Sequence, residues 1–208
     1  MEKNHLVILA KKPRLGYVKR RLAQDIGKVR ALNFYRTNLF SLVRRMKRDN
    51  RWCTWLAITP NSALKVDSCW PKHVRRISQG GGDLGERMSG LVRKLPVGKI
   101  IIIGSDIPEI TADLISRGFR SLSQANLIFG PARDGGYWLI GFDNRSRKLQ
   151  VFSNVRWSTS HALGDTVYNI PPCARVAYLP KLDDIDTGVS FDLWRRRIAV
   201  HYNRLSCW

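Results

Sequence analysis

A short, almost wholly aliphatic strand that ends at a carboxylate is the feature that most constrains the fold of this chain. Residues 99–103 read KIIII, and residues 104–108 read GSDIP. A continuous apolar run of this length is typical of a strand that a parallel sheet buries on both faces. Glycine and proline end the run, so Asp106 is expected at the carboxyl end of a central strand, where open α/β sheets bind their ligands.

Asp106 stands out because the rest of the chain is strongly basic. The net charge is +20, and residues 1–60 alone hold fifteen Lys and Arg against three Asp and Glu. Such a field attracts nucleotides, nucleic acid or anionic lipid alike. A carboxylate at a strand end in this field suggests a metal ion and phosphates. The alternative is that Asp106 only caps the helix expected after Pro108, although Thr111 could cap that helix instead.

Strand and helix patterns alternate along the whole chain. We expect strands at residues 6–10, 52–59, 74–78, 99–103, 126–129, 137–142 and 174–179, and helices at 29–48, 84–95, 111–122, 160–169 and 191–199. This alternation predicts a three-layer α/β/α sandwich with a mostly parallel sheet. At 208 residues and 44% hydrophobic content, the chain favours a single domain over residues 1–208.

Composition also bears on where the protein resides. No apolar run approaches the roughly 18 residues that span a bilayer, and the first run ends by Ala10, which is too short for a signal peptide. The cysteines form no CxxC pair, and the histidines are scattered, so a zinc site is not expected. Reduced thiols in a cytoplasmic protein fit this pattern best. The four cysteines are Cys53, Cys69, Cys173 and Cys207.

One glycine motif has two interpretations. Residues 80–85 read GGGDLG, which satisfies G-x-G-x-x-G, and Asp106 follows Gly85 by 21 residues. That spacing is typical of a dinucleotide-binding dehydrogenase. The preceding strand at 74–78 is, however, too charged for the buried first strand of such a fold, and a complete α/β unit comes before it. The dehydrogenase interpretation is therefore the weaker one.

Six motifs in order carry a resemblance to a known family. They are residues 9–27 (LAKKPRLGYVKRRLAQDIG), 79–88 (QGGGDLGERM), 101–110 (IIIGSDIPEI), 130–142 (GPARDGGYWLIGF), 151–163 (VFSNVRWSTSHAL) and 182–193 (LDDIDTGVSFDL). The chain resembles bacterial GT-A-like transferases, often labelled glycosyltransferase-like or radical-SAM/selenodomain-associated transferases. It is more distantly similar to the 2-phospholactate and molybdenum-cofactor guanylyltransferases. Arg20 and Gly188 depart from the family pattern, which usually has Thr and Pro at these positions.

The donor side of the expected site lies in two loops. The basic loop after the first strand offers backbone amides and cations to a triphosphate, and the resemblance singles out Lys19 as the phosphate contact. The resemblance also implies that glycine backbone approaches the nucleotide base. An exposed basic loop and an ordinary glycine turn are the plain alternatives. The nucleotide-binding candidates are Lys11, Lys12, Arg14, Lys19, Gly80, Gly81, Gly82 and Gly85.

The metal and acceptor sides follow from the later motifs. Magnesium or manganese favours carboxylate and phosphate oxygens, and the resemblance places a second ligand beside Asp106 at Asp186, with Asp183 and Asp184 as competitors. Asp134 is a candidate to orient the acceptor or complete the metal shell, or it only turns a hairpin. Ser158 or Thr159 could instead cap the next helix. The acceptor candidates are Asp134, Gly135, Gly136, Tyr137, Trp157, Ser158 and Thr159, and the catalytic candidates are Lys19, Asp106 and Asp134.

These residues predict a metal-dependent transferase that binds a nucleoside triphosphate or a nucleotide-sugar. We favour transfer of a nucleotidyl group to a small anionic, phosphorylated acceptor, because the basic loop suits a leaving pyrophosphate and residues 105–108 lack the D-x-D motif of many glycosyltransferases. Glycosyl transfer from a nucleotide-sugar is the alternative. Non-enzymatic binding of nucleic acid, through non-specific charge, has no helix-turn-helix, RNA-recognition or zinc-finger pattern to support it.

Overall fold

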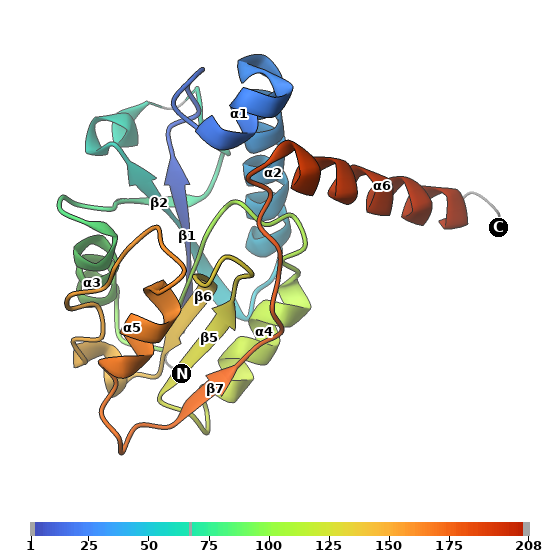
Figure 1. Ribbon diagram of the computed structural model, residues 1–208. Coiled ribbons are helices and arrows are strands. Elements are labelled where there is room, and N and C mark those ends of the chain that lie inside the picture. Colours follow the sequence, from blue (N-terminus) through green and yellow to red (C-terminus); the bar gives the residue numbers. More distant parts are fainter. Residues whose placement is uncertain (1–2, 67, 206–208) are drawn as a thin grey trace.

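The computed structural model describes residues 3–66 and 68–205 and has a central sheet with helices on both faces (Figure 1). The strands are β1 (Asn4–Lys11), β2 (Trp52–Thr59), β3 (Arg75–Ser78), β4 (Ile100–Ile103), β5 (Leu127–Pro131), β6 (Tyr137–Phe142) and β7 (Val176–Tyr178). The helices are α1 (Arg20–Ile26), α2 (Lys28–Lys47), α3 (Leu84–Lys94), α4 (Ala112–Ser121), α5 (Ala162–Tyr168) and α6 (Gly188–Leu205), with short 3-10 turns at Asn61–Lys65 and Ser146–Lys148.

The sheet has seven strands in the order β3-β2-β1-β4-β6-β5-β7. β6 pairs antiparallel with β4 and β5, and the other pairs are parallel. β4, which is formed by the isoleucine run, is the middle strand, and all four of its residues are buried. The mostly parallel sheet expected from the sequence is confirmed.

Two hydrophobic layers enclose the sheet, because alternate residues of each strand point to opposite faces. On one face, Leu6, Ile8 and Ile101 pack with residues of α2 and α4. On the other face, Val7 and Ile102 pack with residues of α3, and α5 lies against the same side (Figure 1). The three-layer sandwich expected from the strand and helix pattern is therefore confirmed.

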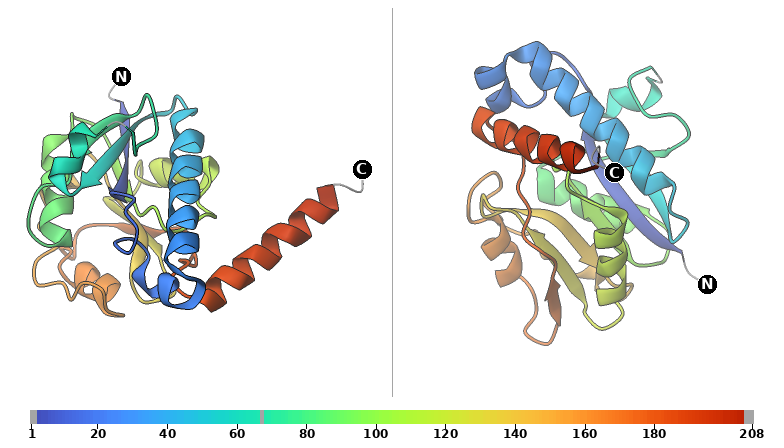
Figure 2. Two further views of the ribbon diagram at one scale, coloured as in Figure 1. Left: turned by 90° about the horizontal axis from the view of Figure 1, so that it is seen from above. Right: turned by 90° about the vertical axis from the view of Figure 1, so that its right-hand side faces the viewer.

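Most of the expected elements are present, and their ends shift by a few residues. α1 was not expected, since the predicted basic loop ran through Lys19 and the first predicted helix began at residue 29. Its Leu22 is buried in a separate small cluster with Ala31, Phe34 and Ile185, against which Phe191 and Trp194 of α6 pack. α6 is also longer than expected, and beyond this cluster it extends away from the body of the protein (Figures 1 and 2).

Other expectations concern single features. β3, which precedes the glycine motif, lies at the edge of the sheet. In a dinucleotide-binding fold, the strand before this motif would instead be a buried strand inside the sheet. Among residues 3–66 and 68–205, no helix is long and apolar enough to cross a membrane. Cys53, Cys69 and Cys173 are free thiols, and Cys207 lies outside the described residues.

Candidate active site

The candidate site lies where β1 and β4 end at their carboxyl edge. Lys12 follows β1, and its amide donates to the Thr59 carbonyl at 2.8 Å. The Tyr35 hydroxyl accepts from the Lys11 amide at 2.9 Å and donates to the Lys11 carbonyl at 2.8 Å, which fixes the end of β1. Burial, followed by the charge of Asp106, raises the pKa of Tyr35, so the phenol stays protonated. These hydrogen bonds hold the end of β1 in place up to the residue where the basic loop begins.

The loop after β4 carries Asp106 and is held by buried contacts. The Asn38 amide of α2 donates to the Ser105 carbonyl at 2.7 Å, and both side chains are buried. Thr111 caps α4 by accepting from the Leu114 amide at 3.2 Å. The alternative role for Asp106, as the cap of this helix, is therefore wrong.

A distant segment brings a second carboxylate to the same place. After β7, the chain continues along the end of β5, where the Leu182 amide donates to the Pro131 carbonyl at 3.1 Å. The Ile185 amide then approaches the Asp106 carbonyl at 3.5 Å. Ser190 of α6 accepts from the Asp186 amide at 3.1 Å and so fixes the turn into the helix. Sequence reasoning did not single out Ser190, although its spacing from Thr187 is typical of a helix-start turn.

Lys19 lies between these two carboxylates, and we call Lys19, Asp106 and Asp186 the cation cluster. The Lys19 ammonium donates to Asp186 Oδ1 at 2.6 Å and lies 3.4 Å from Asp106 Oδ1. The Lys19 side chain is 3% exposed, whereas those of Asp106 and Asp186 are 48% and 38% exposed. Lys19 is therefore not the exposed loop lysine of the plain alternative. In this arrangement, its charge faces the aspartates.

The electrostatics of the cation cluster favour the charged states of Lys19 and Asp186. Burial opposes the charge of Lys19, but Asp106 and Asp186 outweigh burial and raise the pKa of the ammonium. Burial likewise opposes the charge of Asp186, and Lys19 reverses the effect, so the pKa of Asp186 is lowered. Two carboxylate oxygens thus converge on one point that already attracts a cation.

The residues fit a divalent ion only in part. Carboxylate oxygens are suitable ligands for magnesium or manganese, which commonly use one or two carboxylates and complete their shell with phosphate oxygens and water. In the described part of the chain, no group of three or more His, Cys, Asp or Glu side chains is arranged to hold a metal. A metal here would therefore rely on Asp106, Asp186 and the donor's own phosphates.

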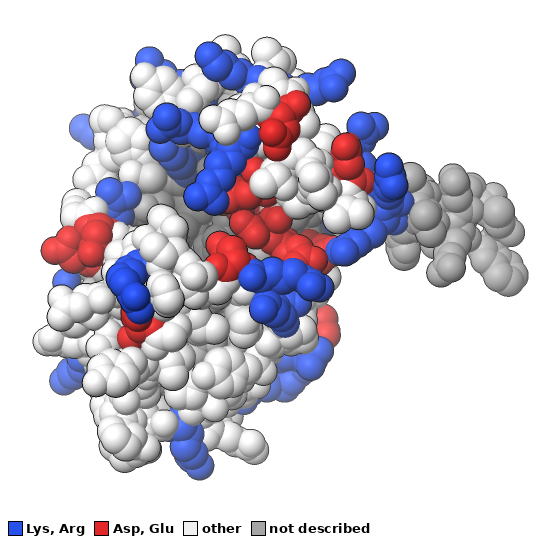
Figure 3. All heavy atoms as spheres, in the orientation of Figure 1, with Lys and Arg blue, Asp and Glu red and all other residues white. Residues whose placement is uncertain are grey.

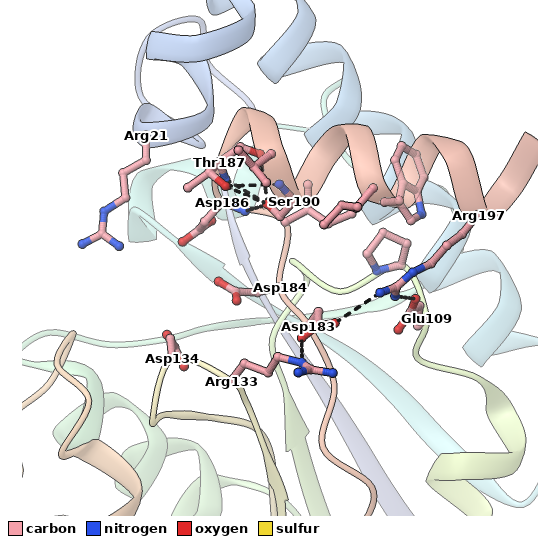
Figure 4. A pocket seen from close by; sticks show the side chains of 15 residues that line it. Arg21, Glu109, Arg133, Asp134, Asp183, Asp184, Asp186, Thr187, Ser190 and Arg197 are labelled. Carbon is pink, nitrogen blue, oxygen red and sulfur yellow. Dashed lines mark hydrogen bonds and ion pairs between the residues drawn. The ribbon is translucent and has the colours of Figure 1, made fainter.

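Further aspartates surround a hollow of about 560 Å³ beside the cation cluster (Figure 4). Burial, then the charges of Asp186 and Asp134, raise the pKa of Asp184 to about 6. Arg197 forms ion pairs with Glu109 at 3.0 Å and with Asp183 at 3.8 Å. The charged side chains that line the hollow are Arg21, Glu109, Arg133, Asp134, Asp183, Asp184, Asp186 and Arg197. Figure 3 shows the acidic patch in the middle of a face that basic side chains surround.

Sequence reasoning missed part of this lining. Arg133, which pairs with Asp183, stands in the same motif as Asp134, so the motif pointed to its region. Glu109 and Arg197 are paired across 88 residues of sequence, and no local signal could have joined them.

Asp134 lines the hollow and also turns the β5–β6 hairpin. Its Oδ1 accepts from the Gly136 amide at 2.9 Å, so the hairpin interpretation is correct as far as the turn goes. Gly135 has φ +86°, and a Cβ placed there would lie 2.2 Å from the Ser160 carbonyl oxygen. The space beside Gly135 is therefore filled by the backbone of Ser160, whereas a ligand was expected there from the sequence.

Four other acceptor candidates lie elsewhere. Tyr137 packs edge-on against Trp157 and reaches Thr166 with its hydroxyl at 3.4 Å, and Trp157 packs on Phe152. We call Tyr137, Phe152 and Trp157 the aromatic cluster, which belongs to the hydrophobic layer shared with α3. The last two candidates are Ser158 and Thr159. Neither they nor these rings line the hollow. Thr159 accepts from the His161 amide at 3.2 Å in the turn before α5, but the helix has no side-chain cap.

The glycine loop serves the chain's own structure at two of its positions. Gly82 has φ +82°, and a Cβ there would clash with Glu86, which forms a capping box with Asp83 at the start of α3. A Cβ at Gly85 would lie 2.8 Å from both Phe152 and Trp157. Gly81 instead has open space beside it, so of these three only Gly81 leaves room for a ligand.

The loop is nevertheless anchored at the same edge of the sheet as the basic loop. The buried Gln79 amide donates to the carbonyls of Ala57 at 2.9 Å and Ala10 at 3.3 Å. The basic loop itself turns at Gly16, with φ +77°, and leaves Lys11 and Arg14 exposed and Lys12 half-buried. The nucleotide-binding candidates of the basic loop and the glycine loop thus lie at the same edge of the sheet. Gly80, in the turn that follows Gln79, has φ +87°.

Solved structures with this fold include complexes with nucleotides. A structure from Desulfovibrio desulfuricans G20, provisionally described as a nucleotide-diphospho-sugar transferase, is 28% identical, with a TM-score of 0.83 over 90% of this chain and 84% of that chain. CMP:2-keto-3-deoxy-manno-octonic acid synthetase complexed with CTP is 11% identical (TM-score 0.57, 96% and 100% covered). Glucosyl-3-phosphoglycerate synthase from Mycobacterium tuberculosis, with Mn²⁺, UDP and glucosyl-3-phosphoglycerate, is 9% identical (TM-score 0.54, 88% and 70% covered).

The fold is therefore that of the GT-A-like, nucleotide-diphospho-sugar transferases, and the comparisons support a nucleotide-binding transferase. Residues 42–159 match a family described as "Uncharacterized protein conserved in bacteria (DUF2064)", and because this match spans more than half of the chain, the protein belongs to that family. Among curated proteins, none matches. The resemblance that the six motifs indicated is confirmed.

Proposed function

We propose that this protein is a metal-dependent nucleotidyltransferase that forms one domain and transfers a nucleotidyl group from a nucleoside triphosphate to a small phosphorylated acceptor. The observation that carries the proposal is the convergence of Asp106 Oδ1 and Asp186 Oδ1 on one cation position at the end of β4, next to the basic loop. Phosphates would be repelled by these carboxylates unless a cation neutralised them, because like charges a few ångströms apart repel strongly at a partly buried site.

The residues divide the reaction between two sides of the cation cluster. Lys11, Lys12 and Arg14 would bind the β- and γ-phosphates and stabilise the leaving pyrophosphate. Asp106 and Asp186 would hold a magnesium or manganese ion, which supplies charge stabilisation of the phosphate oxygens. The manganese and UDP bound to the glucosyl-3-phosphoglycerate synthase support the choice of ion for this fold.

The acceptor would occupy the hollow between Asp134 and Arg197. In-line displacement needs the attacking oxygen across the phosphorus from the leaving group, and the hollow lies beside the cation cluster. Arg21, Arg133 and Arg197 supply positive charge in the hollow, which favours an anionic acceptor.

Glycosyl transfer is the second candidate, and one observation favours it. The similarity with the highest identity and TM-score reported above, 28% and 0.83, is to a protein provisionally described as a nucleotide-diphospho-sugar transferase. The same carboxylates would then serve a departing nucleoside diphosphate. The absence of a D-x-D motif at residues 105–108 weighs against it.

A ligand panel followed by a product assay tests the proposal. Melting temperature is measured with each nucleoside triphosphate and nucleotide-sugar, with Mg²⁺ or with EDTA. We expect a triphosphate to raise the melting temperature only with metal, and incubation with phosphorylated acceptors to release pyrophosphate. Release of a nucleoside diphosphate from a nucleotide-sugar would instead favour glycosyl transfer. No metal-dependent shift with any nucleotide would contradict both.

A further inference from the structure

Lys19 occupies the position where the proposed function needs a metal. Its ammonium touches both carboxylates of the cation cluster, at 2.6 Å and 3.4 Å, through the same Oδ1 atoms that converge on this point. With the Lys19 side chain 3% exposed, solvent screens this charge only weakly. A second cation at the same oxygens would therefore meet strong repulsion.

The backbone also holds Lys19 at this point. Its φ of 47° and ψ of 52° lie in the left-handed region, which a non-glycine residue adopts only at an energetic cost. Its carbonyl accepts from the Ala23 amide at 2.8 Å and begins α1. The strained N-cap residue of α1 thus directs its side chain toward Asp106 and Asp186.

We infer that Lys19 is a built-in counter-cation that keeps the divalent ion out of the Asp106–Asp186 pair until the donor's phosphates arrive. Phosphates bring new negative charge, which compensates both the ammonium and the metal. Metal and phosphate therefore bind synergistically, and metal alone binds weakly. This inference rests on the proposed function, and it goes beyond that function by assigning the order of binding to one residue.

The test measures Mn²⁺ binding to the whole protein by electron paramagnetic resonance, with no nucleotide present. Lys19→Met removes the charge and keeps an unbranched side chain, so the cost of the left-handed backbone stays the same. We expect Lys19→Met to bind Mn²⁺ roughly tenfold tighter or more, the effect of removing one neighbouring positive charge. Lys19→Arg, the matched control, keeps the charge and should bind Mn²⁺ as weakly as the wild type.

A double variant shows whether the gain arises at this site. In Lys19→Met/Asp186→Asn, the tighter Mn²⁺ binding should be lost, because one of the two carboxylates is gone. Equal Mn²⁺ affinity of Lys19→Met and wild type would overturn the inference, and so would a gain that persists in the double variant.

A second measurement uses the wild type alone and covers the case in which Lys19→Met does not fold. Inorganic pyrophosphate should strengthen Mn²⁺ binding to the protein roughly tenfold, after correction for the manganese–pyrophosphate complex in solution. Equal Mn²⁺ affinity with and without pyrophosphate would overturn the inference.

The outcome is distinguishable from a failure of the proposed function. If Lys19→Met gains Mn²⁺ affinity but no nucleotide shifts the melting temperature, the proposed function fails and the antagonism stands. If nucleotide binding depends on metal but Mn²⁺ alone binds wild type and Lys19→Met equally, the antagonism fails and the function stands.

Discussion

The cation cluster and the aromatic cluster both come from motifs that were candidates for the site, and the structure uses them differently. Lys19, Asp106 and Asp186 come from three separate segments and meet beside an open hollow. Tyr137 and Trp157 pack on each other within the hydrophobic layer around α3. One cluster concentrates charge at the surface of a pocket, and the other removes apolar area from water.

The difference lies in what each arrangement costs. Burying an ammonium and holding carboxylates near one another opposes folding unless each charge has a partner, so such a cluster has no obvious purpose in a stable core. Packing of aromatic rings stabilises the folded state, so no ligand is needed to explain why these rings lie within a motif. Charge that is held at a cost is therefore the better guide to function in this protein.

The largest expected effect is the loss of a metal ligand. Asp106→Asn should weaken metal-dependent nucleotide binding by about a hundredfold or more, since one of the two proposed carboxylate ligands would be lost. Asp106 is the cleaner choice because its contact with Lys19 is longer than that of Asp186 and its side chain is half exposed. Thermal shift with Mg²⁺ and nucleotide measures the effect, and Asp192→Asn on the exposed side of α6 is the control. Wild-type affinity in Asp106→Asn would remove the cation cluster from the site.

The second effect separates the two roles of Asp134. Asp134→Asn keeps an oxygen that accepts from the Gly136 amide, whereas Asp134→Ala does not. If the carboxylate orients the acceptor, both variants should lower turnover roughly tenfold to a hundredfold and spare nucleotide affinity. Steady-state rates and a thermal shift with nucleotide measure the two quantities. Wild-type turnover in Asp134→Asn would leave Asp134 with the hairpin turn alone.

The third prediction contrasts two glycines of one loop. Gly85→Ala forces a methyl group against Phe152 and Trp157 and should lower the free energy of unfolding by about 1–3 kcal/mol. Gly81→Ala meets open space and should leave stability nearly unchanged, while nucleotide binding weakens if the base approaches there. Urea unfolding and nucleotide titration of both variants test this. Equal stabilities would show that the aromatic cluster does not depend on Gly85.

The smallest effect is a pH dependence. Because burial raises the pKa of Asp184 from 3.8 to about 6, its protonated form favours the folded state, and this contribution is lost as the pH rises from about 4 to about 6. Asp184→Asn, measured with EDTA, should therefore gain stability relative to wild type between pH 4 and pH 7. After solvent screening, we expect a gain on the order of 1 kcal/mol. A constant difference across this range in urea unfolding would contradict the raised pKa.

Local pattern predicted much of the fold. The aliphatic run placed β4 in the middle of the sheet, and the helical spacing of Tyr35, Leu39 and Val43 predicted α2. α1 was missed because its seven residues hold a single buried side chain, Leu22, and are mostly charged or polar. Periodicity cannot reveal a helix that buries so little.

Family resemblance rather than pattern directed attention to Asp186, and the role of that residue in metal binding stays a prediction. One departure from the family has a structural reason: the Gly188 amide donates to Asp25 at 2.6 Å, which a proline could not do.

The sequence by itself determined which residues end strands, which loops carry charge and which family the motifs resemble, because these follow from local spacing and residue chemistry. The tertiary structure decided which of those residues meet. It put Lys19 between Asp106 and Asp186, although Lys19 and Asp186 are 167 residues apart in the sequence. It also packed Tyr137 and Trp157 against each other, away from the hollow. Charge and ring packing depend on distance in space, and a linear motif carries no such distance.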